Sequence, residues 1–111
     1  MSIEAPPKDD VLRTASVKLV TVIAPCTLGD WLLTDLREIG VTGYTMTKVD
    51  GWGKHGNRQF GLTEEPNIRI DMLVSAELAS VILGRIDARS AEDGMVAFAG
   101  DVEAVPRSHF R

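Results

Sequence analysis

Segments with the two-residue period of β-strands and segments with the helical period follow one another along this chain, and their order restricts the folds that it can adopt. The clearest strand signal is NIRIDMLV (67–74), where Ile68, Ile70 and Met72 alternate with polar residues. VKLVTVIA is short and rich in β-branched residues, which favours a buried strand over a helix. The segments that we expect to be strands are 17–24, 43–50, 67–74 and 95–100.

Two helices are expected between these strands. Apolar residues recur at helical spacing from Leu28 to Ile39, and Gly40 suits the C-terminal stop. After Ser75, a second apolar stripe is formed by Leu78, Val81, Ile82 and Ile86. The order strand, helix, strand, strand, helix, strand is typical of an α+β, ferredoxin-like βαββαβ sandwich. Two helices cover only one face of such a sheet, so the other face is either solvated or packed against another subunit. A strand as apolar as 17–24 favours the subunit.

Composition excludes several classes of protein. The 111 residues fit one domain, and we expect a polar tail at 1–16 followed by a folded domain at 17–111. The net charge of −4 argues against general nucleic-acid binding, which needs a broad basic face. No run approaches the length of a membrane span, and the N-terminus lacks the order of a signal peptide, so we expect no stable membrane insertion and a cytoplasmic location.

Catalytic and metal-binding patterns are weak in this sequence. Cys26 is the single cysteine, so it cannot form an internal disulfide, and neither histidine lies near it in sequence. The two histidines have no cysteine or carboxylate partners at metal-ligand spacing. GWGKHGN lacks the spacing and the final serine or threonine of a Walker loop. We therefore expect no enzyme, no catalytic residue and no metal.

The stretch VKLVTVIAPCTLGDWLLTDLREIGVTGYTMTKVDGWGKHGNR (17–58) resembles the first half of the PII signalling proteins, which are trimeric ferredoxin-like sensors of nucleotides. The positions that carry the resemblance are Glu38, Ile39, Gly40, Gly43, Thr45, Thr47, Val49, Gly51 and Gly53. It covers about residues 17–107 and is thinner after Gly53.

The resemblance implies a homotrimer that binds ADP, AMP or ATP in the clefts between subunits. In this family the nucleotide lies under the base of a long loop, the T-loop (here about 51–66), beside the turn after the second helix (the B-loop) and the C-terminal segment. Glycines would let backbone N–H groups approach phosphate closely, with help from a few cations. The nucleotide-binding residues implied are Ile23, Gly43, Thr45, Gly51, Trp52, Gly53, Lys54, Arg89, Asp93, Gly94, Met95, Arg107 and His109.

The chain departs from the family pattern in both loops. In the B-loop, Glu92 replaces a glycine and Met95 replaces a lysine, although Arg89 could compensate from nearby. We therefore expect ADP or AMP to compete well against ATP. The T-loop is short and has no tyrosine, which puts classical nitrogen sensing in doubt.

The basic residues Lys54, His55 and Arg58 look similar to those of carboxysome-associated PII-like proteins, which bind ADP or AMP and bicarbonate. They are our candidates for a bicarbonate site, and they imply a carboxysome-associated location. The T-loop would dock an unidentified regulated protein. The alternative reading is a small trimeric ferredoxin-like enzyme or metal-binding protein with its site in the subunit cleft, as in divalent-cation tolerance or isomerase-type proteins.

Overall fold

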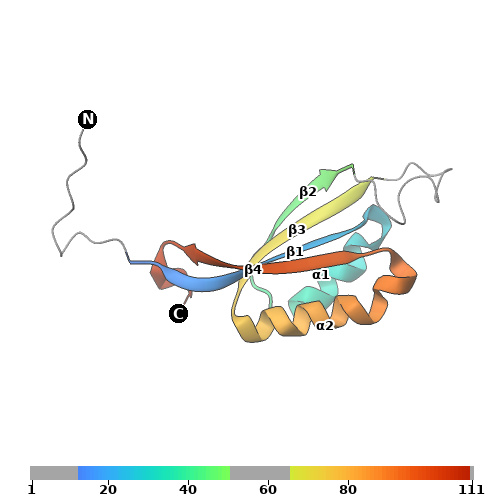
Figure 1. The fold of residues 1–111 in the computed structure, drawn as a ribbon. Coiled ribbons are helices and arrows are strands. Elements are labelled where there is room, and N and C mark those ends of the chain that lie inside the picture. Colours follow the sequence, from blue (N-terminus) through green and yellow to red (C-terminus); the bar gives the residue numbers. More distant parts are fainter. Residues whose placement is uncertain (1–12, 51–65, 111) are drawn as a thin grey trace.

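The computed structural model describes residues 13–50 and 66–110, which form an antiparallel sheet with both of its α-helices on one face (Figure 1). The strands are β1 (Ala15–Pro25), β2 (Thr45–Val49), β3 (Asn67–Val74) and β4 (Val96–Ala104). The helices are α1 (Gly29–Glu38) and α2 (Ala76–Asp93), with the 3-10 turns η2 (Cys26–Leu28) and η3 (Arg107–Phe110).

All six expected elements are present in the expected order. β1 begins at Ala15, inside the segment expected to be a polar tail, and the Thr14 hydroxyl donates to Glu103 at 2.7 Å. β4 continues beyond Gly100 to Ala104, because DVEA pairs with the start of β1. The sheet order is β2-β3-β1-β4, with every neighbouring pair antiparallel. This order confirms the ferredoxin-like fold.

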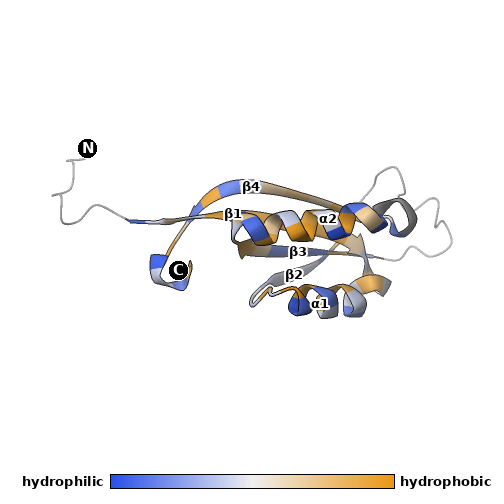
Figure 2. Cartoon of the chain, turned by 90° about the horizontal axis from the view of Figure 1, so that it is seen from below, coloured by the Kyte–Doolittle hydropathy of each residue, from blue (hydrophilic) through white to orange (hydrophobic). Residues whose placement is uncertain are grey.

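The core lies between the sheet and the two helices. Figure 2 looks onto the helix side, where α1 and α2 lie over the sheet. In the antiparallel register, Val20 lies opposite Met72 and Val22 lies opposite Ile70, so these four side chains share the helix-facing side. They pack against apolar side chains of α1 and α2: Leu32, Leu36, Ala79, Ile82 and Ile86. The alternation in 67–74 is therefore the signature of one buried sheet face.

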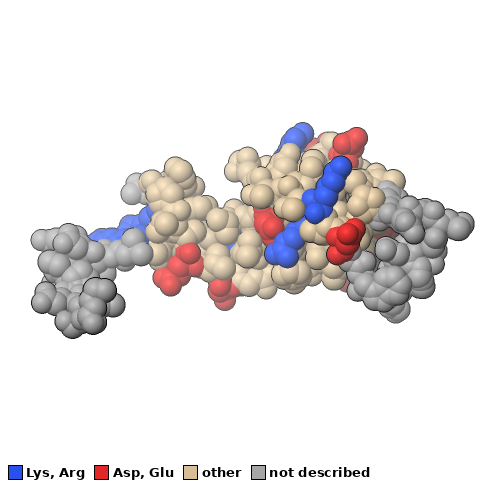
Figure 3. All heavy atoms as spheres, turned by 90° about the horizontal axis from the view of Figure 1, so that it is seen from above, with Lys and Arg blue, Asp and Glu red and all other residues tan. Residues whose placement is uncertain are grey.

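The opposite face of the sheet carries large apolar side chains that nothing in the described part of the chain covers. Leu73, Val96 and Phe98 are 42%, 53% and 49% exposed. By register they lie on the same side as Thr21. Figure 3 looks onto this face, where charged atoms take up a minor part of the surface. We call it the open face.

The sheet has two distinct ends. At the loop end, β1 and β2 finish while β3 and β4 begin; Pro25 and Val49 both pair with Asn67, and the Cys26 N–H donates to the Pro66 carbonyl at 3.0 Å. At the ribbon end, the first residues of β1 pair only with the last residues of β4, and η3 lies beside them (Figure 1). Since β1 has 11 residues, roughly 33 Å separates the two ends.

Candidate functional site

Several of the predicted site residues meet at the loop end. Ile23 is the third residue from the end of β1 and lies opposite Val96, the first residue of β4. Asp93 is the last residue of α2, and Gly94 and Met95 form the turn that leads from it into β4. The chain also leaves β2 and enters β3 at this end. The fold thus brings Ile23 and the α2–β4 turn to the end from which residues 51–65 depart.

Gly94 has the backbone conformation that a phosphate-binding turn needs. Its φ is +70°, in the left-handed region that glycine adopts at little cost, and it follows the last residue of α2. A helical residue followed by a left-handed one turns successive N–H groups toward a common point, which makes an anion-binding concavity. At Gly94 the backbone can therefore turn out of α2 with no side chain in the way of a ligand.

The side chain of Arg89 is already engaged by two neighbours. Its guanidinium carbon lies 4.1 Å from the centroid of the Trp31 ring, and its Nε lies 2.9 Å from Oδ2 of Asp93. The expectation that Arg89 supplies the missing phosphate cation would require the guanidinium to leave these two contacts. Trp31 lies on α1 and packs against the core while it contacts this cation.

Met95 was expected in the site, but its side chain belongs to the hydrophobic core. It is 5% exposed and packs on the helix side of the sheet. The physical reason is that methionine, unlike the family's lysine, gains free energy from burial. Met95 therefore brings no cation to the turn.

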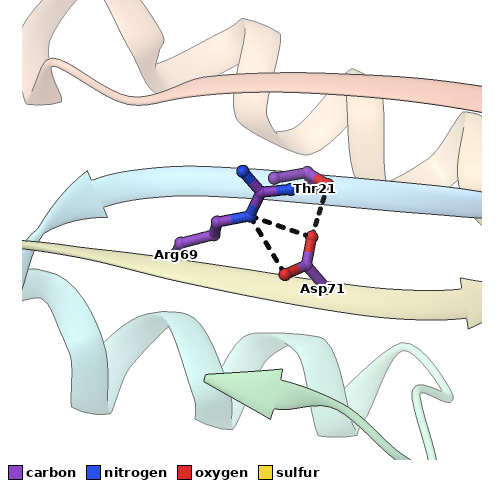
Figure 4. Close-up of polar contacts among 3 residues, drawn as sticks. All are labelled: Thr21, Arg69 and Asp71. Carbon is purple, nitrogen blue, oxygen red and sulfur yellow. Dashed lines mark hydrogen bonds and ion pairs between the residues drawn. The ribbon is translucent and has the colours of Figure 1, made fainter. Parts of the chain in front are cut away.

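Thr45 is the first residue of β2, Gly43 lies two residues before it, and both are exposed. Thr45 is paired with Asp71, whose other neighbour in the sheet is Thr21. The Thr21 hydroxyl donates to Oδ1 of Asp71 at 2.6 Å, and Arg69 Nε donates to Oδ2 at 3.0 Å (Figure 4). A polar cluster thus lies on the open face beside Thr45.

Sequence reasoning missed this cluster as part of the candidate site. Its signals were the polar pair Arg69 and Asp71, two residues apart on one strand face, and a threonine within an otherwise apolar strand. Pairing across strands could not be read from either signal. Thr21 is fully buried, and its hydroxyl is satisfied by Asp71.

Asp71 is held in its ionised form. Burial raises its pKa, but the hydrogen bonds from Arg69 and Thr21, together with the positive charge of Arg69, outweigh burial and leave the pKa below the ordinary value of 3.8. A lasting negative charge therefore lies among the apolar side chains of the open face.

Arg107 and His109 lie on η3 at the ribbon end, and both are exposed. The C-terminus and the α2–β4 turn lie at opposite ends of the sheet (Figure 1). A single subunit therefore does not bring the expected C-terminal residues to the α2–β4 turn.

The remaining predicted residues lie outside the described part of the chain: Gly51, Trp52, Gly53, Lys54, His55 and Arg58. The side chain of Glu92 is likewise outside it. Within residues 13–50 and 66–110, no three His, Cys, Asp or Glu side chains lie close enough together to hold a metal ion. In the same ranges, no helix has the length and apolar character to cross a membrane.

The sequence profile of the family described as nitrogen regulatory protein P-II matches residues 17–109. The chain belongs to the P-II family. This confirms the resemblance, which was expected over about residues 17–107. No curated protein sequence gives a significant match.

Solved structures of PII-like proteins share the fold. A structure from Thermus thermophilus, described as a PII-like signalling protein, has 29% identity and a TM-score of 0.72, covering 90% of this chain and 100% of that one. CPII from Thiomonas intermedia K12, bound to ADP and bicarbonate, has 24% identity and a TM-score of 0.76, covering 91% and 100%. The same CPII bound to ADP, AMP and acetate has 22% identity and a TM-score of 0.76, covering 90% and 99%.

The Asp71 cluster predicts a pH-dependent contribution to stability. Since the folded-state pKa of Asp71 lies below its unfolded value of about 3.9, this contribution is present above that value and is lost as the pH falls through the folded-state pKa. We expect Asp71→Asn to be less stable than wild type near neutral pH, with the difference shrinking below about pH 4. Denaturant titrations at several pH values measure this.

Asp101→Asn is the control for this prediction. Asp101 is also paired with a cation, Lys18 at 2.7 Å, but its side chain is 86% exposed, so little effect is expected at any pH. A stability difference between wild type and Asp71→Asn that stays constant across the acidic range would contradict the assignment.

Proposed function

We propose that this chain is a trimeric PII-like regulator that binds ADP or AMP, and ATP less favourably, in the clefts between its subunits. Membership of the P-II family supports a regulatory protein rather than an enzyme. The CPII structures support the choice of ligand, because CPII is similar in fold and was solved with ADP, AMP and bicarbonate.

The observation that carries the proposal is the division of the candidate site between the two ends of one sheet. Ile23 and the α2–β4 turn lie at the loop end, whereas Arg107 and His109 lie at the ribbon end. A cleft that uses both groups needs the ribbon end of one subunit to lie against another subunit. The uncovered apolar open face gives such association its driving force.

The preference for ADP or AMP over ATP follows from the cations that the turn lacks. The side chain of Met95 is buried, and Arg89 is engaged by Trp31 and Asp93. Backbone N–H groups at Gly94 then supply the phosphate contacts with less compensating positive charge. Because ATP carries the most negative charge of the three nucleotides, it loses the most.

Bicarbonate is the second proposed ligand, and inorganic-carbon status is the proposed input. Lys54, His55 and Arg58 are the candidate small-anion residues. The CPII complexes with bicarbonate support this choice. In this proposal 17–111 is the regulatory domain, residues 51–66 are the T-loop that contacts a regulated protein, and the protein works in the cytoplasm in association with carboxysomes.

Calorimetric titration with ADP, AMP and ATP tests the ligand proposal. We expect saturable binding of ADP and AMP, weaker binding of ATP, and tighter ADP binding in the presence of bicarbonate at fixed pH and ionic strength, because two ligands that order the same site bind cooperatively. Absence of binding by all three nucleotides would favour the enzyme or metal-binding alternative. An ADP affinity unchanged by bicarbonate would refute only the carbon-sensing part.

The open face predicts the oligomeric state. Sedimentation should give a mass close to that of three 12.1 kDa chains. Phe98→Glu, which places a charge on this face, should lower the mass, because an unpaired charge is costly to bury in an interface. Val81→Glu is the matched control: Val81 is 46% exposed on α2, on the other side of the sheet. Equal masses for the two variants would show that the open face is not the interface.

If Arg107 contacts phosphate, its replacement should weaken nucleotide binding. Arg107→Ala should weaken ADP binding by about 1.5–3 kcal/mol, the range for hydrogen bonds to charged groups, and AMP should lose less if the second phosphate is what Arg107 holds. Arg13→Ala removes another exposed arginine from the ribbon end and serves as the control. Unchanged ADP affinity in Arg107→Ala would place η3 outside the site.

A further inference from the structure

Two arginines of α2 reach across to α1 one helical turn apart. Arg85 Nη1 lies 2.6 Å from Oδ1 of Asp35, and the Arg89 guanidinium stacks on the ring of Trp31. Residues four apart on a helix share one face, so Arg85 and Arg89 pair with Asp35 and Trp31 in antiparallel order. The two contacts join the helices, which lie side by side on the sheet (Figure 2). We call them the interhelical contacts.

The interhelical contact made by Arg89 differs from that made by Arg85, because Arg89 also contacts a residue at the α2–β4 turn. Arg89 contacts Trp31 on α1 and, at the same time, Asp93, the last residue of α2. Asp93 directly precedes Gly94, whose left-handed backbone shapes the turn. The position of the turn is thereby connected to the first turn of α1, which η2 links to the end of β1.

The ion pair by itself would not fix Asp93. Pairs at positions i and i+4 with one exposed partner contribute little, because a long side chain must be held in one geometry. Arg89 is 47% exposed, so its pair with Asp93 is of this kind. Stacking on Trp31 removes much of the guanidinium's freedom before the pair forms. It also keeps a cation beside a carboxylate that would otherwise repel an anion at Gly94.

We propose that Arg89 is a positioning residue for the nucleotide site: stacked on Trp31, it holds and neutralises Asp93 at the α2–β4 turn and does not itself contact phosphate. This inference rests on the proposed nucleotide-binding function. It assigns Trp31, which lies on α1 outside the site residues expected from sequence, a part in ligand affinity.

A double-mutant cycle on Arg89 and Trp31 tests the proposal. Arg89→Ala and Trp31→Leu should each weaken ADP binding by about two- to fivefold, the scale of one cation–π contact. The double variant should be no weaker than the weaker single variant, because both changes release the same turn. Arg89→Lys, which keeps the charge but stacks less well, should recover part of the affinity.

Arg85→Ala is the matched control. It removes the interhelical contact between Arg85 and Asp35. Because Asp35 is only 14% exposed, the loss of its cation should lower thermal stability. It should leave ADP affinity unchanged, because Arg85 does not contact the turn residue Asp93. A loss of ADP affinity in Arg85→Ala equal to that in Arg89→Ala would reduce the effect to general helix loosening and overturn the proposal.

Trp31 fluorescence gives a second readout, measured in a Trp52→Phe background so that Trp31 is the one tryptophan left. Because Trp52 is itself a predicted site residue, the ADP affinity of this background is measured first and serves as its reference. Arg89→Ala should change its emission and Arg85→Ala should not. Saturating ADP should leave the emission unchanged, since Arg89 stays on the ring. A shift of Trp31 emission on ADP binding would mean that Arg89 leaves Trp31 for the phosphate and would overturn the proposal. The same conclusion would follow if Arg89→Ala lowered ADP affinity more than tenfold while Trp31→Leu left it unchanged.

Failure of the Arg89 proposal can be distinguished from failure of the proposed nucleotide-binding function. If wild type binds no adenine nucleotide, the proposed function fails and the site role of Arg89 fails with it. The interhelical contact between Arg89 and Trp31 is still measured without ligand, by the coupling of Trp31→Leu and Arg89→Ala in the free energy of unfolding. If Trp31→Leu does not fold, Trp31→Phe retains an aromatic ring with weaker cation binding and replaces it in the cycle.

Discussion

The pairing of β1 with a strand on each side is the constraint on which the remaining structure depends. β3 and β4 both bind β1 along most of its length, so the register of β1 fixes which residues of distant segments meet. Ile23 is placed beside Val96, and Thr21 is placed between Asp71 and Phe98. Because the strand period is two, a slip of one residue would turn the core side chains toward the open face. The same register separates the loop end from the ribbon end, and with them the two halves of the candidate site.

The open face combines apolar side chains suited to association with the negative charge of Asp71, which would be costly to bury without partners. Leu73 and Phe98 favour burial against another subunit, whereas the ionised Asp71 would oppose it if it were unpaired. Thr21 and Arg69 satisfy the carboxylate within the same chain. An interface over this face would therefore bury a charge that is already hydrogen-bonded, which is the condition under which buried charges are tolerated. The cluster also lies beside Thr45, so association and ligand contact would share residues.

The helix face uses its arginines for contacts within the chain. Arg85 and Arg89 join α2 to α1, and Arg37 lies over the ring of Tyr44 and donates to its hydroxyl at 3.1 Å. A sequence offers no means of distinguishing such arginines from those that are free to bind an anion. This is why Arg89 was expected to compensate for the missing lysine, although its guanidinium is held by Trp31 and Asp93. The distinction matters for function, because a cation held in this way positions a turn without adding charge to a ligand.

The sequence by itself determined the elements, their order and the family. The spacing of apolar residues along each segment marks its buried face directly. The glycines and the EIG of 38–40 stand at family positions, so the family of 17–109 could be recognised without coordinates. Only the tertiary structure decided that Met95 is buried, that Asp71 is shared by Thr21 and Arg69, and that Arg107 lies a sheet's length from Gly94. The physical reason is that local pattern reports the environment of each residue along its own element. Which side chains meet depends on strand register and helix packing, and these join residues as far apart as Thr21 and Asp71 in the sequence.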